Sequence, residues 1–145
     1  EFSEERAGDV MVPVDELVSV PRDVTPAQLE REVAKTGFSR YPVVDEEGMP
    51  VFYIHLKDIL FAGPDQRDLP LDEWRFREMP VVQAGDEVED ALRIMQRSGT
   101  HLAEVVKDGQ TVGVLFLEDV IEELVGEVRD SLQREDVFIE RNLDA

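Results

Sequence analysis

Two aspartates occupy matching places in the sequence, and their position suits a polar ligand. Asp58 follows the apolar run 51–54, and Asp119 follows the apolar run 111–116. Each aspartate opens the first turn of a predicted helix. A carboxylate there can cap the helix and complement its dipole, which is worth about 0.5–1 kcal/mol. It can instead accept hydrogen bonds from a ribose diol, as acidic residues do in nucleotide sites. The sequence leaves both roles open.

The segment Ser39-Arg40-Tyr41-Pro42 is a second candidate for ligand binding. It opens a predicted strand just after Gly37, which ends the preceding helix. Arginine carries a rigid fork of donors that matches a phosphate group. A surface ion pair would satisfy Arg40 equally well, because the chain has 34 acidic side chains.

Residues that commonly carry catalysis are scarce. The sequence has no cysteine, which excludes disulfides, thiolate nucleophiles and cysteine-based zinc sites. The two histidines, His55 and His101, lack the i, i+4 spacing of a metalloprotease helix. No glycine-rich phosphate loop and no nucleophile elbow occur in the sequence. We therefore expect neither an enzyme nor a metal centre.

The candidate residues belong to an internal repeat. An offset of 62 aligns Val20 with Val82 and Gly37 with Gly99. The second copy has a turn that is one residue shorter, so an offset of 61 then aligns Asp58 with Asp119. A repeat of this kind predicts two copies of one supersecondary unit that share a core.

Each copy is predicted to have the element order β-α-β-β-α. The predicted strands are 17–20, 41–44 and 51–54 in the first copy, and 80–82, 102–106 and 111–116 in the second. Asp108-Gly109 joins the last two strands and is a strong hairpin signal. One unit of about 50 residues is only marginally stable by itself. We therefore expect the two units to pack sheet against sheet, with pseudo-two-fold symmetry and clefts at the junction.

Capping residues predict where the helices begin and end. Thr25 with Gln28 forms a capping box in the first copy, and Asp86 with Glu89 is the expected equivalent in the second. The closing helix should be short in the first copy, ending near 61–62. In the second copy it is long and has a continuous apolar face, formed by Leu117, Val120, Ile121, Leu124, Val125 and Val128.

The segment 63–78 between the copies is rich in turn residues, yet it contains apolar side chains that should cover part of the core. These are Leu69, Leu71, Trp74 and Phe76. Beyond 130 the apolar face stops, and 137–139 is expected to start a further element. The chain opens with Glu1, without a leader, which suggests a fragment of a longer protein.

The charge balance restricts the partners. With 34 acidic and 15 basic side chains, the net charge is −19. Nucleic acid and anionic membrane surfaces would be repelled, because both require lysine and arginine. No run of about 18 apolar residues is present, so we expect no direct membrane insertion. Divalent cations and small anions remain eligible ligands.

Five segments in this order carry a family resemblance. They are DVMVPVDELVSV, GFSRYPVVDEEG, IHLKDIL, HLAEVV and VLFLEDVIEELVGEVRD. Together they resemble the cytoplasmic CBS domain pair (Bateman module) of CorC-type magnesium and cobalt transport proteins, also called hemolysin-like or cyclin-M-like proteins. The resemblance covers about residues 8–130. It implies an α/β fold of tandem CBS modules, ATP or AMP with Mg²⁺ as ligand, and a homodimer.

The resemblance also implies a set of binding residues. Beside Asp58, these are Val12, Phe38, Ser39, Arg40, Tyr41, Pro42, Phe116, Glu118 and Asp119. Two positions depart from the family pattern, because Val12 and Phe116 stand where the family has threonines. Each lost hydroxyl would leave a phosphate oxygen unpaired, at about 1–3 kcal/mol. The Phe116 ring either fills the cleft or stacks on an adenine, and we expect it to fill the cleft.

These observations predict four segments and one main function. The segments are a first CBS module (8–62), a connector (63–78), a second CBS module (79–130) and a tail (131–145) that leads to a further C-terminal domain. The predicted function is regulation of a membrane magnesium or divalent-cation transport protein, at the cytoplasmic face of the cell membrane. Its partners would be a second copy and the protein's own transmembrane and C-terminal domains. The alternative is a module that has lost nucleotide binding, and that serves in dimerisation or senses divalent cations through Glu122, Glu123, Glu127 and Asp130.

Overall fold

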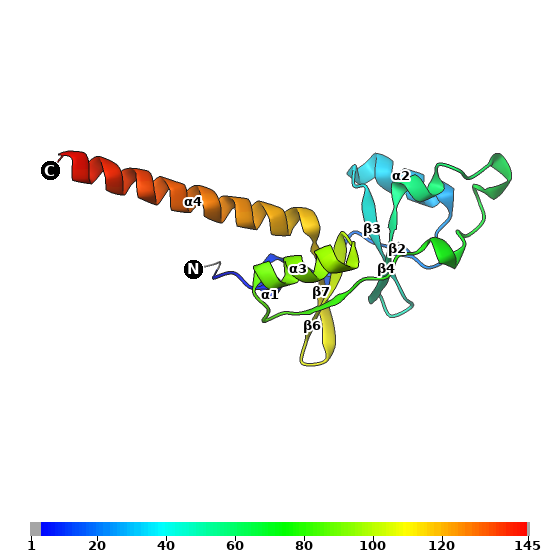
Figure 1. Cartoon of the computed structure of the whole chain (residues 1–145). Helices are drawn as coiled ribbons and strands as arrows, with labels where there is room; N and C mark the ends of the chain where they lie inside the picture. The colour runs from blue at the N-terminus through cyan, green and yellow to red at the C-terminus, as the bar shows by residue number, and fades with distance from the viewer. Residues whose placement is uncertain (1–3, 145) are drawn as a thin grey trace.

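Two small mixed sheets, each covered by helices, make up the body of the molecule (Figure 1). The computed structural model describes residues 4–144, with side chains to residue 133. One sheet has the order β2-β3-β4 and the other the order β1-β7-β6-β5. The strands are β1 (Val12–Pro13), β2 (Val20–Pro21), β3 (Arg40–Val44), β4 (Pro50–His55), β5 (Val81–Gln83), β6 (Leu102–Lys107) and β7 (Gln110–Phe116). The α/β tandem fold expected from the sequence is confirmed.

Strand pairing repeats with the offset found in the sequence. Val20 pairs in parallel with Val43, and Val82 pairs in parallel with Val105. The register shift that follows Val43 recurs after Val105. The two copies therefore share backbone detail as well as element order. In the β6–β7 hairpin, Asp108 and Gly109 both have positive φ, at 52° and 77°, as the primed turn requires.

The first long helix of each copy also repeats, but it begins differently. Helix α2 (Pro26–Thr36) has the expected capping box, in which Gln28 N–H donates to the Thr25 hydroxyl. Helix α3 (Val88–Ser98) has Glu87 as its N-cap and no side-chain cap. The capping box expected from Asp86 is wrong, because its carboxylate instead accepts a hydrogen bond from the N–H of Gln83. Gly37 and Gly99 end the two helices in the left-handed conformation, as predicted.

The N-terminal segment packs on the sheet of the second copy. Helix α1 (Ala7–Val10) hydrogen-bonds through Ala7 N–H to the Asp86 carbonyl, at 2.9 Å, and Ala7 is fully buried. Strand β1 then pairs with β7. The sequence placed residues from 8 onward in the first module and did not foresee this crossing. The other module boundaries stay predictions.

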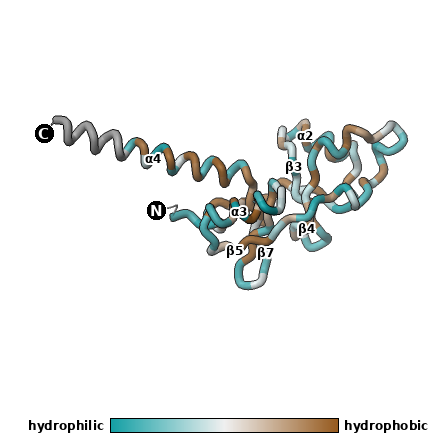
Figure 2. The backbone as a smooth tube through the Cα atoms, viewed as in Figure 1, coloured by the Kyte–Doolittle hydropathy of each residue, from teal (hydrophilic) through white to brown (hydrophobic). Residues whose placement is uncertain are grey.

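A shared apolar cluster joins the two sheets. Each copy has its own core, and a third cluster of Tyr53, Leu102 and Val114 lies between them. Leu17 and Met79, which the repeat aligns, both pack against this junction cluster. Figure 2 shows hydrophobic chain around β7 and at intervals along α4. The residues of this junction cluster therefore form the predicted packing of one sheet against the other.

The closing elements of the two copies differ most. The first copy has only a 3-10 turn, η2 (Leu56–Ile59), rather than the short α-helix predicted. The second has α4 (Leu117–Asp144), which extends well beyond the body of the molecule (Figure 1). The element expected at 137–139 is a continuation of α4, and its side chains lie outside the described part.

The apolar face of α4 is divided. Val120 is buried in the core of the second module, and Leu117 and Leu124 pack against it. Four further apolar side chains on the helix are exposed, namely Ile121, Val125, Val128 and Leu132. Only some of the side chains on the apolar face predicted from the sequence therefore pack against the second module, and the rest are exposed.

The connector covers core with half of its apolar residues. It contains the 3-10 turns η3 (Pro64–Gln66) and η4 (Glu73–Arg75). Phe76 is buried and Leu71 packs beside it, as predicted, whereas Leu69 and Trp74 are exposed. Within residues 4–144, no helix has the length and apolarity needed to cross a membrane.

Candidate functional site

A cleft of about 730 Å³ opens where the two modules meet. This volume lies within the range of about 300–1,000 Å³ that is typical of small-molecule sites. One wall comes from the segment 37–40, which leads into β3. Another part of the lining comes from the end of β7, with Phe116, and from the start of α4, with Glu118 and Asp119. Val12, from the strand that crosses between the modules, completes the enclosure.

Seven of the ten predicted site residues line this cleft. They are Val12, Phe38, Ser39 and Arg40 from the first half of the chain, and Phe116, Glu118 and Asp119 from the second. Residues that lie some 80 positions apart in the sequence are thus brought to one site by the pseudo-two-fold packing.

Asp119 is free to accept hydrogen bonds from a ligand. In the described part of the chain, no hydrogen bond or ion pair involves its carboxylate. Burial raises the pKa of Asp119, and the negative charges of Glu122 and Glu118 raise it further. The surroundings of Asp119 therefore disfavour its ionised form. Among the described residues, no side chain donates a hydrogen bond to its carboxylate or forms an ion pair with it.

Asp58, the repeat partner of Asp119, is fully engaged. Its Oδ2 accepts a hydrogen bond from the N–H of His55 at 3.0 Å, and its Oδ1 accepts one from Arg77 Nη2 at 2.9 Å. Its side chain is only 12% exposed. Asp58 is therefore a capping and ion-pairing residue here, and the structure does not bring it to the cleft. The connector supplies Arg77, which has no counterpart beside Asp119.

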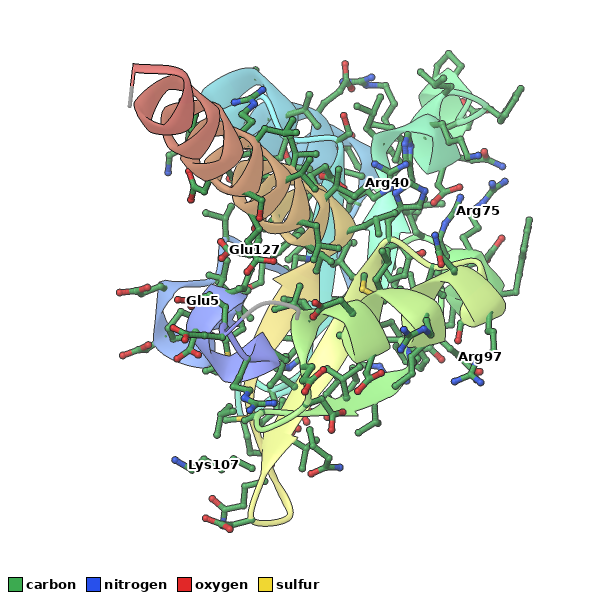
Figure 3. All side chains as sticks on the ribbon, turned by 60° about the vertical axis from the view of Figure 1, so that its left-hand side comes forward. Glu5, Arg40, Arg75, Arg97, Lys107 and Glu127 are labelled. Atoms are coloured by element: carbon green, nitrogen blue, oxygen red, sulfur yellow. The ribbon has the colours of Figure 1, made fainter. Side chains whose placement is uncertain are left out.

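Arg40 is also without a partner in the cleft. No ion pair or hydrogen bond to its guanidinium occurs among the residues described, even though the chain has 34 acidic side chains. Figure 3 shows Arg40 far from Lys107, which lies near the tip of the β6–β7 hairpin. The surface ion pair considered from the sequence is absent from the described part. Arg40 and Asp119 therefore line one cleft, and the donors of Arg40 and the acceptors of Asp119 are available for a ligand.

Tyr41 and Pro42 are buried behind the cleft rather than exposed to it. The Tyr41 hydroxyl donates to the Phe38 carbonyl at 2.9 Å and shares a hydrogen bond with the Thr36 hydroxyl at 2.8 Å. Pro42 is buried in β3 opposite Tyr53. Neither residue lines the cleft, and Tyr41 instead positions the segment that carries Phe38.

Phe116 lines the cleft. Its ring is partly buried against the junction cluster, next to Leu17. A cleft is present beside it, and the role of its ring in ligand binding stays a prediction. Phe116 and Val12 line the cleft with apolar surface. They occupy the two positions at which the family pattern has threonine hydroxyls.

Sequence reasoning missed five residues of the lining. These are Glu16, Leu17, Val18, Gly37 and His101. The repeat itself held the signal for His101, because the offset of 62 places it at the position of Ser39. The structure confirms this equivalence: Leu56 N–H donates to the Ser39 carbonyl and Leu117 N–H to the His101 carbonyl, both at 2.8 Å.

The electrostatics of the site are mixed. Three carboxylates, those of Glu16, Glu118 and Asp119, share the lining with the cationic Arg40. Just behind Arg40, burial lowers the pKa of His55, and the positive charges of Arg40, Arg77 and Lys57 lower it further against an opposing effect of Asp58. His55 Nδ1 accepts a hydrogen bond from the N–H of Lys57 at 3.0 Å, which fits a neutral ring.

The acidic run on α4 does not gather into a metal site. Across the described residues, no group of three or more histidine or acidic side chains is placed to hold a metal ion. The carboxylates instead repel one another: burial raises the pKa of Glu123, with further contributions from Glu5, Glu127 and Asp130. Figure 3 shows Glu5 and Glu127 on the same side of the molecule.

Known proteins share this fold and sequence pattern. The CBS domain family model matches residues 7–65 and 73–126. An uncharacterized protein of Mycobacterium tuberculosis is 43% identical over 107 residues, which is 73% of this chain and 31% of that protein. The magnesium and cobalt efflux protein CorC of Escherichia coli is 27% identical over 139 residues, which is 94% of this chain and 47% of CorC. The chain thus spans less than half the length of both relatives.

A solved structure agrees with this arrangement. The CBS domain of a bacterial CNNM/CorC family Mg²⁺ transporter in complex with ATP superposes with a TM-score of 0.75 at 28% identity. The match covers 85% of this chain and 89% of that one. The repeat, the sheets and these comparisons agree: the chain belongs to the CBS domain family and is a pair of CBS domains similar to those of CorC and the CNNM/CorC transporters.

Proposed function

We propose that the cleft between the modules binds an adenine nucleotide, ATP or AMP with Mg²⁺. The observation that carries this proposal is that Arg40 and Asp119, which come from different modules and have no partner among the described residues, line one cleft. Arg40 suits a phosphate because its guanidinium offers paired donors. Asp119 suits the ribose hydroxyls because a carboxylate only accepts hydrogen bonds.

The two aspartates provide an internal comparison. Outside the cleft, the connector places Arg77 on Asp58. At the equivalent position of the second copy, Asp119 is left exposed to the cleft, and burial and like charges disfavour its ionised form. Asp119 lies in the first turn of α4, where a carboxylate complements the helix dipole, and its oxygens are available to accept hydrogen bonds from a ligand. The likeness to the CBS domain solved with ATP supports adenine nucleotide over other ligands that carry a diol and a phosphate.

The acidic side chains of the lining favour a nucleotide whose phosphates carry a bound Mg²⁺ ion. Glu16 and Glu118 would repel the phosphates of a free triphosphate. A magnesium ion bound to those phosphates would offset the repulsion. We expect ATP to bind more tightly with Mg²⁺ than without it, and AMP to depend less on Mg²⁺ because it carries less charge.

Calorimetric titration with ATP, ADP and AMP, with and without Mg²⁺, tests the proposal. Asp119→Asn and Arg40→Gln should each weaken ATP binding by about tenfold or more, as for hydrogen bonds to charged groups. Asp130→Asn and Arg97→Gln change the same charges at exposed positions outside the cleft and should bind like the wild type. A wild type that binds none of the three nucleotides at millimolar concentration would contradict the proposal and favour a purely structural or cation-sensing module.

At the level of the whole protein, we propose a regulatory rather than a catalytic role. The relatives include a magnesium and cobalt efflux protein, and the chain matches less than half of its length. The module would act at the cytoplasmic face of the cell membrane, in contact with its own transmembrane and C-terminal domains. A bound nucleotide can shift transport only if it prefers one arrangement of the modules. Cation flux through the full-length protein should therefore respond to nucleotide, and the response should be lost in Asp119→Asn.

We also propose that the module forms a homodimer. Ile121, Val125, Val128 and Leu132 are spaced at i, i+4, i+7 and i+11 on α4, and all four are exposed. An apolar stripe at this spacing is typical of a helix that packs against another helix. Sedimentation at tens of micromolar should show a dimer that Val125→Asp weakens. The exposed polar-face change Gln133→Asp serves as the control.

A further inference from the structure

We propose that His101 is a second, pH-dependent cationic contact for the ligand's phosphate, beside the permanently charged Arg40. This inference rests on the proposed nucleotide function and adds to it a residue and a mode of regulation. Among the lining residues described, His101 is the only one besides Arg40 that can carry positive charge. Histidine is the side chain whose charge ordinarily changes between about pH 5 and 8.

The main chain fixes His101 at the edge of the cleft. Its N–H donates to the Tyr53 hydroxyl at 3.3 Å, and its carbonyl accepts from the N–H of Leu117 at 2.8 Å. Tyr53 is 3% exposed and belongs to the first module, so the contact crosses the junction. His101 is therefore held by both modules at a fixed point of the site, while its side chain stays 42% exposed.

The repeat aligns His101 with a residue that adjoins Arg40. His101 stands in the second copy where Ser39 stands in the first, and both line the cleft. Ser39 is adjacent to Arg40, which we assign to phosphate. Arg40 and His101 come from different modules and line the same cleft, so a phosphate bound there has one cationic group available from each module.

Acidic groups face the imidazole from the adjoining elements. On α4, Glu118 Oε1 lies 3.9 Å from His101 Nδ1, and Asp119 follows it. Glu16 lies on the turn after β1, and Arg40 on β3 is the only permanent cation of the described lining. From β4, the neutral hydroxyl of Tyr53 contacts the backbone of His101 rather than its ring.

Protonation of His101 changes the charge balance of the cleft. With a neutral imidazole, the three carboxylates outnumber the one arginine by two charges. With a protonated imidazole the excess falls to one, and Glu118 is directly paired. Phosphate affinity should therefore rise as the pH falls. A ligand without phosphate should be indifferent to His101, which makes the residue a determinant of specificity as well as of pH response.

Titration of ATP and of adenosine into the wild type and His101→Gln, at pH 6 and pH 8 and constant excess Mg²⁺, tests the inference. We expect the wild type to gain at least about fivefold more in ATP affinity on acidification than His101→Gln does. Protonation of ATP itself, and of Asp119, affects both proteins and cancels in this comparison. Adenosine affinity should be equal in the two proteins at each pH. His55→Gln, a histidine outside the described lining, should keep the wild-type pH response.

The outcomes separate the two proposals. Equal pH responses of wild type and His101→Gln would overturn the role of His101 and leave nucleotide binding intact. A His101-dependent pH response for adenosine would also overturn it, because the effect would not involve phosphate. Failure of the wild type to bind ATP at either pH would contradict nucleotide binding itself, and the inference with it.

Discussion

The main chain of Gly113 lies directly against Val12. A Cβ atom on Gly113 would come within 2.5 Å of the Val12 carbonyl oxygen and 2.6 Å of Met11 Sδ. Only glycine fits such an approach, because the first contact is with backbone that has no room to move. Gly113 in β7 thus allows β1 to pair with the second sheet, and β1 carries Val12 to the cleft.

Gly113→Ala should detach β1 and destabilise the fold by about 1–3 kcal/mol, the range of other overpacking changes. Thermal or denaturant unfolding measures this directly. Gly126→Ala is the matched control, because nothing lies within 4 Å of a Cβ there and the residue is helical. That change should stabilise the fold by up to about 1 kcal/mol. Equal changes in unfolding free energy for Gly113→Ala and Gly126→Ala would show that the close approach of Gly113 to Val12 does not affect stability.

The elements that repeat were predictable, and those that break the repeat were not. Gly37 and Gly99 end their helices in the predicted conformation, because a left-handed cap depends only on local sequence. The crossing of β1 is a long-range pairing of two residues, which leaves almost no periodic signal. One sign of it was present: Gly113 interrupts an apolar strand where the first copy has Phe52.

The same distinction holds for the candidate site. Arg40 was found from the segment in which it lies and from the fit of arginine to phosphate, and Asp119 because the repeat aligns it with Asp58. The difference between Asp58 and Asp119 could not be found, because it depends on Arg77, a connector residue 19 positions from Asp58. His101 was missed although the offset of 62 aligns it with Ser39, because the two residue types differ; the backbone contacts confirm that the two positions are equivalent.

Asp58 and Asp119 should respond oppositely to loss of charge. Asp58→Asn removes the charge from a cap and an ion pair and should cost about 1–3 kcal/mol of unfolding free energy. Asp119→Asn should leave the ligand-free fold as stable as the wild type, or more stable, because burial and like charges oppose its ionisation. Chemical denaturation at pH 7 without ligand measures both. A larger loss for Asp119→Asn would mean that Asp119 is structural.

The pH dependence of stability gives Asp119 a second test. Because the pKa of Asp119 is raised on folding, the folded state holds its proton more tightly than the unfolded state. The contribution of Asp119 to stability therefore falls as the pH rises from its ordinary value, near 4, through its raised folded value. Without ligand, Asp119→Asn should gain stability relative to the wild type between pH 4 and pH 7. A constant difference over that interval would contradict the assignment.

Phe116 should contribute to nucleotide affinity through its ring. Its ring packs against the junction cluster and also lines the cleft, so we expect its cleft-facing side to stack on the adenine. Phe116→Leu keeps the apolar contact with the junction cluster and should weaken ATP binding by about 1–3 kcal/mol. Phe52→Leu removes a comparable ring from the first module's core and should not alter affinity in the folded protein. Unchanged affinity of Phe116→Leu would place the base elsewhere.

The central claim is that Arg40 and Asp119 hold different ends of one nucleotide, and a two-ligand titration tests it most directly. ATP and adenosine, each titrated calorimetrically into the wild type, Arg40→Gln and Asp119→Asn, separate phosphate from ribose contacts. The account predicts that Arg40→Gln weakens ATP about tenfold or more while leaving adenosine unchanged, and that Asp119→Asn weakens both. Wild-type affinity for ATP in either variant, or no ATP binding by the wild type, would contradict it.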